Sequence, residues 1–506
     1  MTFFSWVFPV FLAVAAAVYY LIPGKHQWLV LLAASLVFYL WRSPLCGLYL
    51  LFTGAVTYGA GRLLGRLNDL PREQRSAAKG RKKLVLTLDL VLLFGLLFFV
   101  KYWKDTASLL GISGGLDLLL PMGISVYIFQ SVGYAVDCYR GKYPPEKNPL
   151  KLLLFVSFFP QMVQGPISRF DQLGPQLTTP HSWDADSVKY GIQRMLWGYL
   201  KKLVIADRAG VIVAAVLGHP ESYGGAVTAF GVLFYCIQLY CDFSGGIDIT
   251  IGAAQLFGIT VAENFRRPIF ARSLAEYWRR WHITLGTWMR DYVFYPLSMS
   301  KPFARLGKAA RKHIPGRAGK VVATALATFV VYLIIGIWHG ADVKYIVFGL
   351  WNGLLMTLSV LLAGPFLTAR EKLHADEKKG WFPVFQTLRT MLIVFAGRYL
   401  TASAGLSAAL SGLWKTVRHP CLYQVADGTL MNLGLTAGDF IVVGVGVAVL
   451  LVLEWRQEQG VELRRALERK SVFVQFLCLF VPLMLLLFLG ILRNSAVDAA
   501  FIYQQF

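Results

Sequence analysis

Long apolar stretches recur along the whole chain, and they constrain the fold more than any other feature. The stretch from Val321 to Trp338, for example, contains no Lys, Arg, Asp or Glu. A membrane-spanning helix needs about 20 consecutive, mostly apolar residues, and this chain is 56% hydrophobic but only 15% charged. The sequence therefore predicts an all-α, polytopic integral membrane protein with about 11–13 membrane helices, some of them re-entrant.

The expected membrane segments differ in clarity. The clearest are Phe3–Ile22, Leu84–Trp103, Val321–Trp338, Tyr345–Phe366, Phe440–Leu453 and Val472–Leu492. Shorter or more polar ones are Trp28–Trp41, Cys46–Gly61, Leu118–Val136, Lys151–Ile167, Gly191–Leu217, Ala226–Tyr240, Ile247–Phe257 and Phe382–Leu400. No Lys or Arg precedes the first segment, so we interpret it as a retained span and not as a signal peptide.

The formal net charge is +22, which alone would also suit a nucleic-acid-binding protein. However, the basic residues cluster between apolar stretches, at Arg62–Lys83, Lys301–Lys320, Arg370–Lys379 and Arg456–Lys470. Such clusters are typical of cytoplasmic loops that face anionic lipid. We therefore expect a multi-pass plasma-membrane protein that contacts lipid and binds no nucleic acid. Counting spans from these loops puts Trp338 toward the outer side and both termini outside.

The chain contains no recognisable soluble domain, so we expect one membrane-embedded domain over residues 1–506. Its expected parts are peripheral helices (residues 1–115), a catalytic core (residues 116–353) and C-terminal helices (residues 354–506). In the core, Gly, Pro, Gln, Asp and Arg interrupt the apolar runs. Interrupted helices at membrane depth are tolerated only where protein or a water-filled cavity surrounds them, which is why the core is placed there.

The first polar motif of the core is CDFSGGIDITIG, which begins at Cys241. A carboxylate within an apolar helix costs about 2.5–3.5 kcal/mol on insertion scales, so Asp242 should face a partner or water. The glycines that follow Ser244 permit either close helix packing or a helix break. In the second case Asp242 would cap the next helix, and the sequence leaves both interpretations open.

The second motif is EYWRRWHITLGTW, which begins at Glu276. A single helix would bring Trp278, Trp281, His282, Leu285 and Trp288 to one side, and Glu276 could pair with Arg279 and Arg280. This pattern predicts an amphipathic helix at the membrane interface. For His282 alone, a hydrogen-bonded interface histidine is the favoured interpretation.

The third motif is GIWHGAD, in which His339 ends a membrane-length apolar run. A neutral imidazole can take or give a proton near neutral pH, and Gly340 would leave room for a substrate atom. A packed or capping histidine would explain this position as well. Of the eight histidines, however, only His282 and His339 lie in Trp-rich sequence at a membrane edge. We find no zinc-ligand spacing and no P-loop, so neither a metal nor a bound cofactor is expected.

The three motifs occur together with FFPQMVQGPISRF, which begins at Phe158, ENFRRPI, which begins at Glu263, and the C-terminal FIYQQF. In the order in which they follow one another along the chain, these motifs resemble the membrane-bound O-acyltransferase family. Within it they resemble the bacterial branch that acylates cell-envelope polymers. The resemblance implies a helical core around a central tunnel. It makes His339 the family's essential histidine and His282 its second motif histidine. It also implies that an acyl thioester enters from the cytoplasm and that the acyl group leaves on an outer hydroxyl.

On this resemblance His339 would act as the general base, and Trp338, His282 or backbone amides would stabilise the oxyanion. Arg279 could meet a donor phosphate, although lipid headgroups would explain it equally well. The residues expected to bind substrate or to line the tunnel are Trp338, Asp242, Ser244, Asn264, Trp281, Arg279, Gln161 and Gln164.

The expected reaction transfers an acyl group, with acetyl favoured, from acetyl-CoA or an acyl-carrier protein. The expected acceptor is an envelope polysaccharide, and an extracytoplasmic partner with a hydrolase fold would complete the transfer. One alternative is D-alanyl transfer to teichoic acid. Others are a transporter or flippase, which would also use broken helices, and a scaffold for an envelope synthase. Of these classes, only an enzyme would consume thioester.

Overall fold

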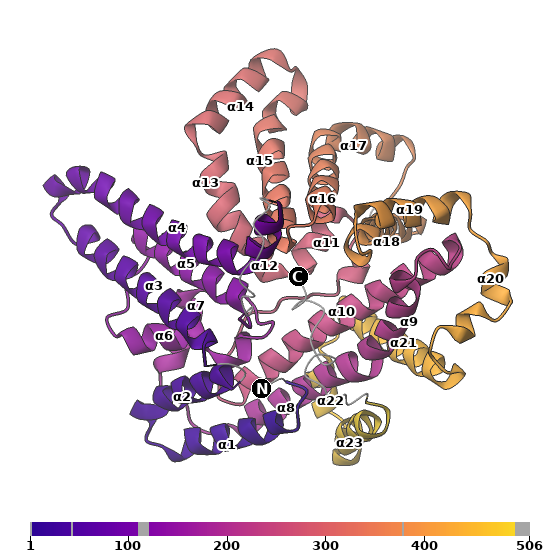
Figure 1. Ribbon diagram of the computed structural model, residues 1–506, viewed down its shortest axis with the longest axis horizontal. Helices are drawn as coiled ribbons and strands as arrows, with labels where there is room; N and C mark the ends of the chain where they lie inside the picture. The colour runs from indigo at the N-terminus through magenta and orange to yellow at the C-terminus, as the bar shows by residue number, and fades with distance from the viewer. Residues whose placement is uncertain (1–2, 42–43, 110–120, 377–378, 491–506) are drawn as a thin grey trace. The chain divides into compact units, whose positions relative to one another are not determined.

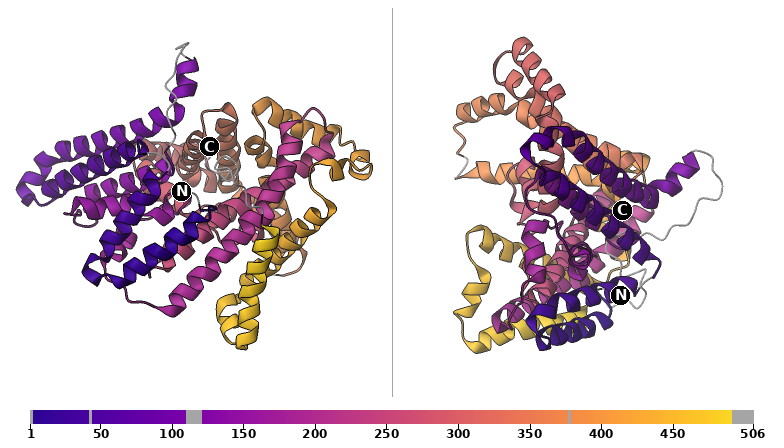
Figure 2. Two further views of the ribbon diagram at one scale, coloured as in Figure 1. Left: turned by 60° about the horizontal axis from the view of Figure 1, so that its bottom comes forward. Right: turned by 90° about the vertical axis from the view of Figure 1, so that its left-hand side faces the viewer.

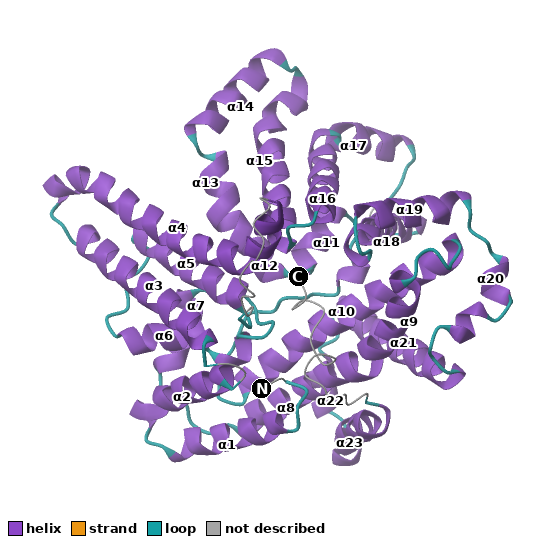
Figure 3. Ribbon diagram, in the orientation of Figure 1, coloured by secondary structure: helices purple, strands orange, loops and turns teal. Residues whose placement is uncertain are grey.

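The computed structural model describes residues 3–41, 44–109, 121–376 and 379–490. Within these residues every regular element is helical (Figure 3), and the β structure is limited to one isolated bridge between Phe265 and Trp281. The all-α prediction is therefore confirmed. The C-terminal FIYQQF motif and residues 118–120 of an expected segment lie outside the described residues.

The described chain divides into two compact units. Unit 1 contains residues 3–199 and 245–263, and unit 2 contains residues 200–244 and 264–490. The boundary falls inside a single helix, after Ser244. Each unit is treated separately below.

Unit 1 begins with the helices α1 (Val7–Leu21), α2 (Gln27–Leu40), α3 (Cys46–Asn68), α4 (Arg72–Leu109), α5 (Ile124–Arg140), α6 (Pro149–Ser157), α7 (Phe170–Thr178) and α8 (Ala185–Tyr199). The helices α3, α4 and α5 pack side by side (Figures 1 and 2). The basic residues of Arg62–Lys83 lie mostly on the adjoining ends of α3 and α4, and not on a long loop.

Helix α10 runs from Gly225 to Gln255 without interruption. Of the two interpretations left open for the glycines after Ser244, the helix break is therefore wrong and close packing is confirmed. In unit 1, a Cβ on Gly198 of α8 would lie 2.5 Å from the carbonyl oxygen of Gly245. A Cβ on Gly191 would lie 2.8 Å from the carbonyl oxygen of Gly252. The glycines thus let two helix backbones touch.

Unit 2 contains the first part of α10 together with α9 (Asp207–Gly218), α11 (Leu274–Arg280), α12 (Ile283–Met289), α13 (Tyr295–Ser298), α14 (Lys301–His313), α15 (Gly316–His339), α16 (Val343–Leu361), α17 (Ala363–Lys372), α18 (Trp381–Ala402), α19 (Leu406–Arg418), α20 (Tyr423–Ala426), α21 (Ala437–Glu458), α22 (Leu463–Glu468) and α23 (Val472–Leu489). A π-helical segment, Leu200–Ala206, precedes α9. The expected segment Gly191–Leu217 is therefore divided among three elements.

In unit 2, helices α15 and α16 pack closely against each other and lie side by side in Figure 1. A Cβ on Gly336 would lie 2.5 Å from the Tyr345 carbonyl oxygen and 2.8 Å from the Gly349 Cα. Backbone therefore packs on backbone where the pair converges. Helix α14, which carries most of the basic cluster that was expected as a loop, packs against α15.

Six of the described helices are long and apolar enough to cross a membrane. They are Arg72–Trp103, Gly225–Gln255, Ala318–His339, Val343–Leu361, Ala437–Glu458 and Val472–Leu489. Two shorter apolar segments, Val7–Leu21 and Pro149–Gln161, accompany them. The prediction of a multi-pass membrane protein is confirmed, while several other expected segments form shorter or more polar helices.

Candidate active site

His282 lies in a break between two short helices and not on one continuous helix. Helix α11 ends at Arg280 and α12 begins at Ile283, and His282 has a φ of 48° in the left-handed region. The prediction of a single amphipathic helix is therefore wrong at this point. A left-handed conformation costs a residue other than glycine about 1–2 kcal/mol, so other contacts must hold the break.

Those contacts come from Asn264. Its Oδ1 lies 3.2 Å from Nδ1 of His282 and accepts hydrogen bonds of 2.9 Å from both the backbone N–H and the hydroxyl of Thr284. The Asn264 carbonyl accepts a further bond, of 3.0 Å, from the N–H of Ile283. One buried asparagine thus replaces the helical hydrogen bonds that the break removes.

The His282 ring is enclosed by aromatic side chains. Its centroid lies 4.9 Å from that of Phe243 and 6.3 Å from that of Trp338. Burial lowers the pKa of His282 to about 3, because a charged imidazolium is disfavoured away from water. The structure therefore brings together three of the expected site residues, His282, Asn264 and Trp338, around a neutral imidazole.

His339 is the last residue of α15 and is partly exposed. Its ring centroid lies 4.9 Å from that of Trp338, 6.2 Å from that of Tyr345 and 6.0 Å from that of Phe348. The expected space beside Gly340 is filled, because a Cβ there would lie 2.6 Å from the Tyr345 ring. The glycine therefore lets an aromatic ring approach the chain and does not leave room for substrate.

Trp281 is fixed from several sides. It stacks on Tyr277 at 5.7 Å and meets Phe265 edge-on at 5.0 Å. The guanidinium of Arg398 lies over the Trp281 ring at 4.9 Å and donates a 2.8 Å hydrogen bond to the Tyr277 hydroxyl. Arg398 was missed from the sequence, although a charged residue within the expected span Phe382–Leu400 was the available signal.

Asp242 and Ser244 face the π-helical segment. Asp242 pairs with Lys202 at 2.5 Å, and the hydroxyl of Ser244 accepts a 2.9 Å hydrogen bond from Lys201. The expectation that the buried carboxylate faces a partner is confirmed. Between these two residues, Phe243 points to His282. The described contacts thus make Asp242 and Ser244 anchors for this turn of α10, and two lysines in apolar sequence were the missed signal.

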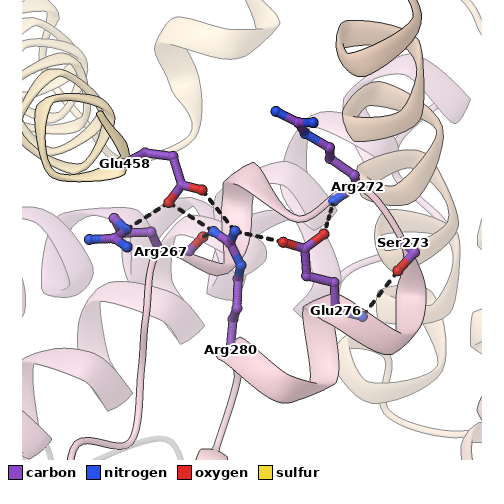
Figure 4. Close-up of polar contacts among 6 residues, drawn as sticks. All are labelled: Arg267, Arg272, Ser273, Glu276, Arg280 and Glu458. Atoms are coloured by element: carbon purple, nitrogen blue, oxygen red, sulfur yellow. Dashed lines mark hydrogen bonds and ion pairs between the residues drawn. The ribbon is translucent and has the colours of Figure 1, made fainter. Parts of the chain in front are cut away.

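Arg279 and Arg280 have different surroundings. Arg280 pairs with Glu276 at 2.6 Å and with Glu458 at 2.8 Å (Figure 4). Arg267 also reaches Glu458, at 2.8 Å. Arg279 is exposed and makes no hydrogen bond or ion pair within the described residues. The expected pair between Glu276 and Arg280 is confirmed, and the expected pair between Glu276 and Arg279 is absent there.

Gln161 and Gln164 belong to unit 1. Gln161 accepts a 2.7 Å hydrogen bond from Gln130 and donates one of 2.8 Å to Ser168. Gln164 is buried, and neither atom of its amide finds a partner among the described residues. Both glutamines are therefore buried in unit 1, and Gln161 is hydrogen-bonded to Gln130 and Ser168. In the same described part of the chain, no group of three or more His, Cys, Asp or Glu residues could hold a metal ion.

Comparison with known proteins gives a consistent result. The family model described as MBOAT, membrane-bound O-acyltransferase family, matches residues 146–311, a range that includes Asn264 and His282 but ends before His339. A protein of Pseudomonas syringae pv. tomato named "Probable alginate O-acetylase AlgI" is 32% identical over 417 residues, which are 81% of this chain and 74% of that protein.

Two further relatives carry other names. A peptidoglycan O-acetyltransferase of Helicobacter pylori is 28% identical over 66% of this chain and 65% of its own length. A teichoic acid D-alanyltransferase of Bacillus subtilis is 28% identical over 48% of this chain and 59% of its own length. The chain therefore belongs to the membrane-bound O-acyltransferase family.

Proposed function

We propose that this acyltransferase transfers an acetyl group from a cytoplasmic thioester to hydroxyl groups of an envelope polysaccharide outside the membrane. The names of the relatives support the reaction class, since they describe acetyl or D-alanyl transfer to alginate, peptidoglycan or teichoic acid. The thioester, acetyl-CoA or an acylated carrier protein, would be a co-substrate and not a bound cofactor. An extracytoplasmic partner with a hydrolase fold would carry the acyl group onward to the polymer.

The observation that carries the proposal is the arrangement of two imidazoles around the Trp338 ring, at 4.9 Å for His339 and 6.3 Å for His282. In the proposed reaction, a hydroxyl oxygen attacks the thioester carbonyl. The new C–O bond forms, the C–S bond breaks, and the hydroxyl proton passes through a base to the leaving thiolate. We assign the base to His339, because its partly exposed ring can be reached by a substrate.

The direction of transfer is supported by the two ends of α15. This helix has 24 residues and is therefore about 36 Å long, which is enough to cross a hydrocarbon core of about 30 Å. The basic helix α14 adjoins its first residues, and His339 is its last residue. Basic residues favour the cytoplasmic side, so the reacting hydroxyl would approach His339 from the opposite side.

The proposal can be tested with the purified chain in nanodiscs and acetyl-labelled acetyl-CoA. We expect loss of thioester and labelling of an added polysaccharide when the extracytoplasmic partner is also present. His339→Ala should lower the rate by about 100-fold or more, since a positioned base contributes about that much, while elution and thermal unfolding stay unchanged. His313→Ala, on the exposed face of α14, is the matched control.

Other outcomes would distinguish the alternatives. Turnover with a D-alanyl carrier protein but not with acetyl-CoA would change the donor and keep the reaction class. Movement of a labelled acyl carrier or glycan without loss of thioester would support a transporter. A normal rate in His339→Ala would remove this residue as the base.

A further inference from the structure

The orientation of the Asn264 amide is determined by its neighbour Thr284. The backbone N–H of Thr284 lies 2.9 Å from the Asn264 side chain, and a backbone N–H can only donate. The Asn264 atom at this position must therefore be the oxygen, because the amide NH2 group would place two donors face to face. The usual ambiguity between the two ends of an asparagine side chain does not arise here.

The same oxygen determines the protonation of His282. Oδ1 of Asn264 lies 3.2 Å from Nδ1 of His282, and an amide oxygen can only accept. Nδ1 must therefore carry the hydrogen. In a neutral imidazole the lone pair then lies on the other nitrogen, Nε2. The nitrogen that is turned away from Asn264 is consequently an acceptor.

The surroundings of the ring keep His282 neutral. The ring is buried and faces Phe243 from α10 and Trp338 from α15. Two titratable groups adjoin these aromatic residues in the sequence. Asp242 precedes Phe243 and is paired with Lys202, and His339 follows Trp338. From α18, the Arg398 guanidinium lies over the adjacent Trp281, and from α21 Glu454 accepts a hydrogen bond from Tyr240, whose ring lies near Trp281. Burial disfavours an imidazolium at this position.

We infer that Asn264 is a positioning residue, which holds His282 with Nε2 as a hydrogen-bond acceptor during acyl transfer. This inference rests on the proposed function and deepens it. It removes His282 from the candidates for stabilising the oxyanion, since Nδ1–H is engaged and Nε2 carries no hydrogen. The substrate group that His282 takes must therefore be a donor, such as the acceptor hydroxyl or the released thiol.

A second observation indicates a ligand at this position. Nδ2 of Asn264 is fully buried and has no hydrogen-bond partner among the described residues. A buried donor without a partner is costly, and in native proteins such groups need an explanation. An acceptor atom of a bound substrate or a bound water would supply the missing partner.

The test is the pH dependence of kcat for thioester loss in Asn264→Asp and Asn264→Ala. Asp keeps an acceptor oxygen for Nδ1–H but adds a charge that favours the imidazolium. We expect the acidic limb of its profile to move up by about one pH unit or more, with activity lost below that limb and recovered above it. Asn264→Ala should lose about 10-fold or more in kcat, with little change in KM and no recovery. Asn148→Asp, where Asp can keep the cap of α6, should leave the profile unchanged.

Contrary outcomes are separable. Higher neutral activity in Asn264→Asp, or a shift of the basic limb, would mean that His282 acts as a protonated donor. Equal losses in both variants without any movement of the acidic limb would make Asn264 only structural. If the wild-type chain turned over no thioester, the acyl-transfer proposal would fail. The tautomer would still be tested by ¹⁵N NMR of histidine-labelled protein, with His282→Gln identifying the signals, where Nδ1 without a proton would refute the inference.

Discussion

The two histidine motifs of unit 2 are held in opposite ways. His339 ends a regular helix whose backbone packs directly on α16 through Gly336 and Gly349. His282 lies in a left-handed break between α11 and α12, where the side chain of Asn264 supplies the hydrogen bonds. Backbone packing fixes the first region, and side-chain polar contacts fix the second.

This difference bears on what each imidazole can do. Three aromatic rings lie close to the His339 ring, and aromatic contacts limit where a ring lies without deciding which nitrogen carries the proton. An amide oxygen at hydrogen-bond distance decides both. The aromatic surroundings of His339 suit a base that must take a proton and then release it. The hydrogen bond to Asn264 suits His282 as a residue that must keep one protonation state.

The largest expected effect comes from Gly336→Leu, which attacks the backbone-packed region. The new Cβ would lie 2.5 Å from the Tyr345 carbonyl oxygen and 2.8 Å from the Gly349 Cα, and neither backbone atom can move aside alone. We expect destabilisation of about 3 kcal/mol or more, measured as loss of monodisperse protein and of thermal stability in detergent. Gly444→Leu on α21, where an added Cβ meets no atom within 4 Å, should remain folded. An unaffected Gly336→Leu would show that the helix pair is not backbone-packed.

Arg398→Met should have a smaller and different effect, because it alters the polar region. It removes the cation over Trp281 and the donor to Tyr277, while the methionine still fills most of the space. Exchanging a buried charge for an apolar side chain is often neutral for stability. We therefore expect kcat to fall by about 10-fold and the unfolding temperature to stay within a few degrees.

Arg389→Met is the control for the same helix, because Arg389 is exposed and donates to the carbonyl of Arg272. Arg389→Met should change neither kcat nor the unfolding temperature. If Arg398→Met instead lost folded protein while the remaining protein kept its kcat, the polar contacts of Arg398 would serve stability and not catalysis.

The sequence predicts the helical membrane fold because apolar length is a local property that no tertiary contact has to supply. It also predicts Asn264, His282, Trp338 and His339 as site residues, and all four lie in unit 2. It does not predict the break at His282, since neither Trp281 nor His282 is a helix-breaking residue. The cause is Asn264, 18 residues earlier, whose hydrogen bonds override local helix preference.

The glycines also show that local sequence cannot predict a feature that a distant residue decides. The pair after Ser244 permits a break or a close contact, and only the partner glycines on α8 decide between them. Gly340 permits an empty space or a neighbouring ring, and the Tyr345 side chain from the next helix fills it. A glycine in the sequence indicates that something comes close, and the fold determines what it is.

The smallest expected effect is that of Glu458→Gln, which tests whether ion pairs share in holding the polar region. In Figure 4 the Glu458 carboxylate joins Arg267 and Arg280, at side chains that remain between 18% and 32% exposed. Partly exposed pairs contribute about 0–1 kcal/mol, and the glutamine oxygen can still accept one hydrogen bond. We expect a drop of at most a few degrees in the unfolding temperature and no change in kcat. Added salt should make this drop smaller, because it screens the ion pairs in the unchanged protein. Glu462→Gln, in the more exposed pair with Arg465, should have no effect. A loss as large as that of Gly336→Leu would mean that this ion-pair cluster, and not Asn264, holds the break at His282.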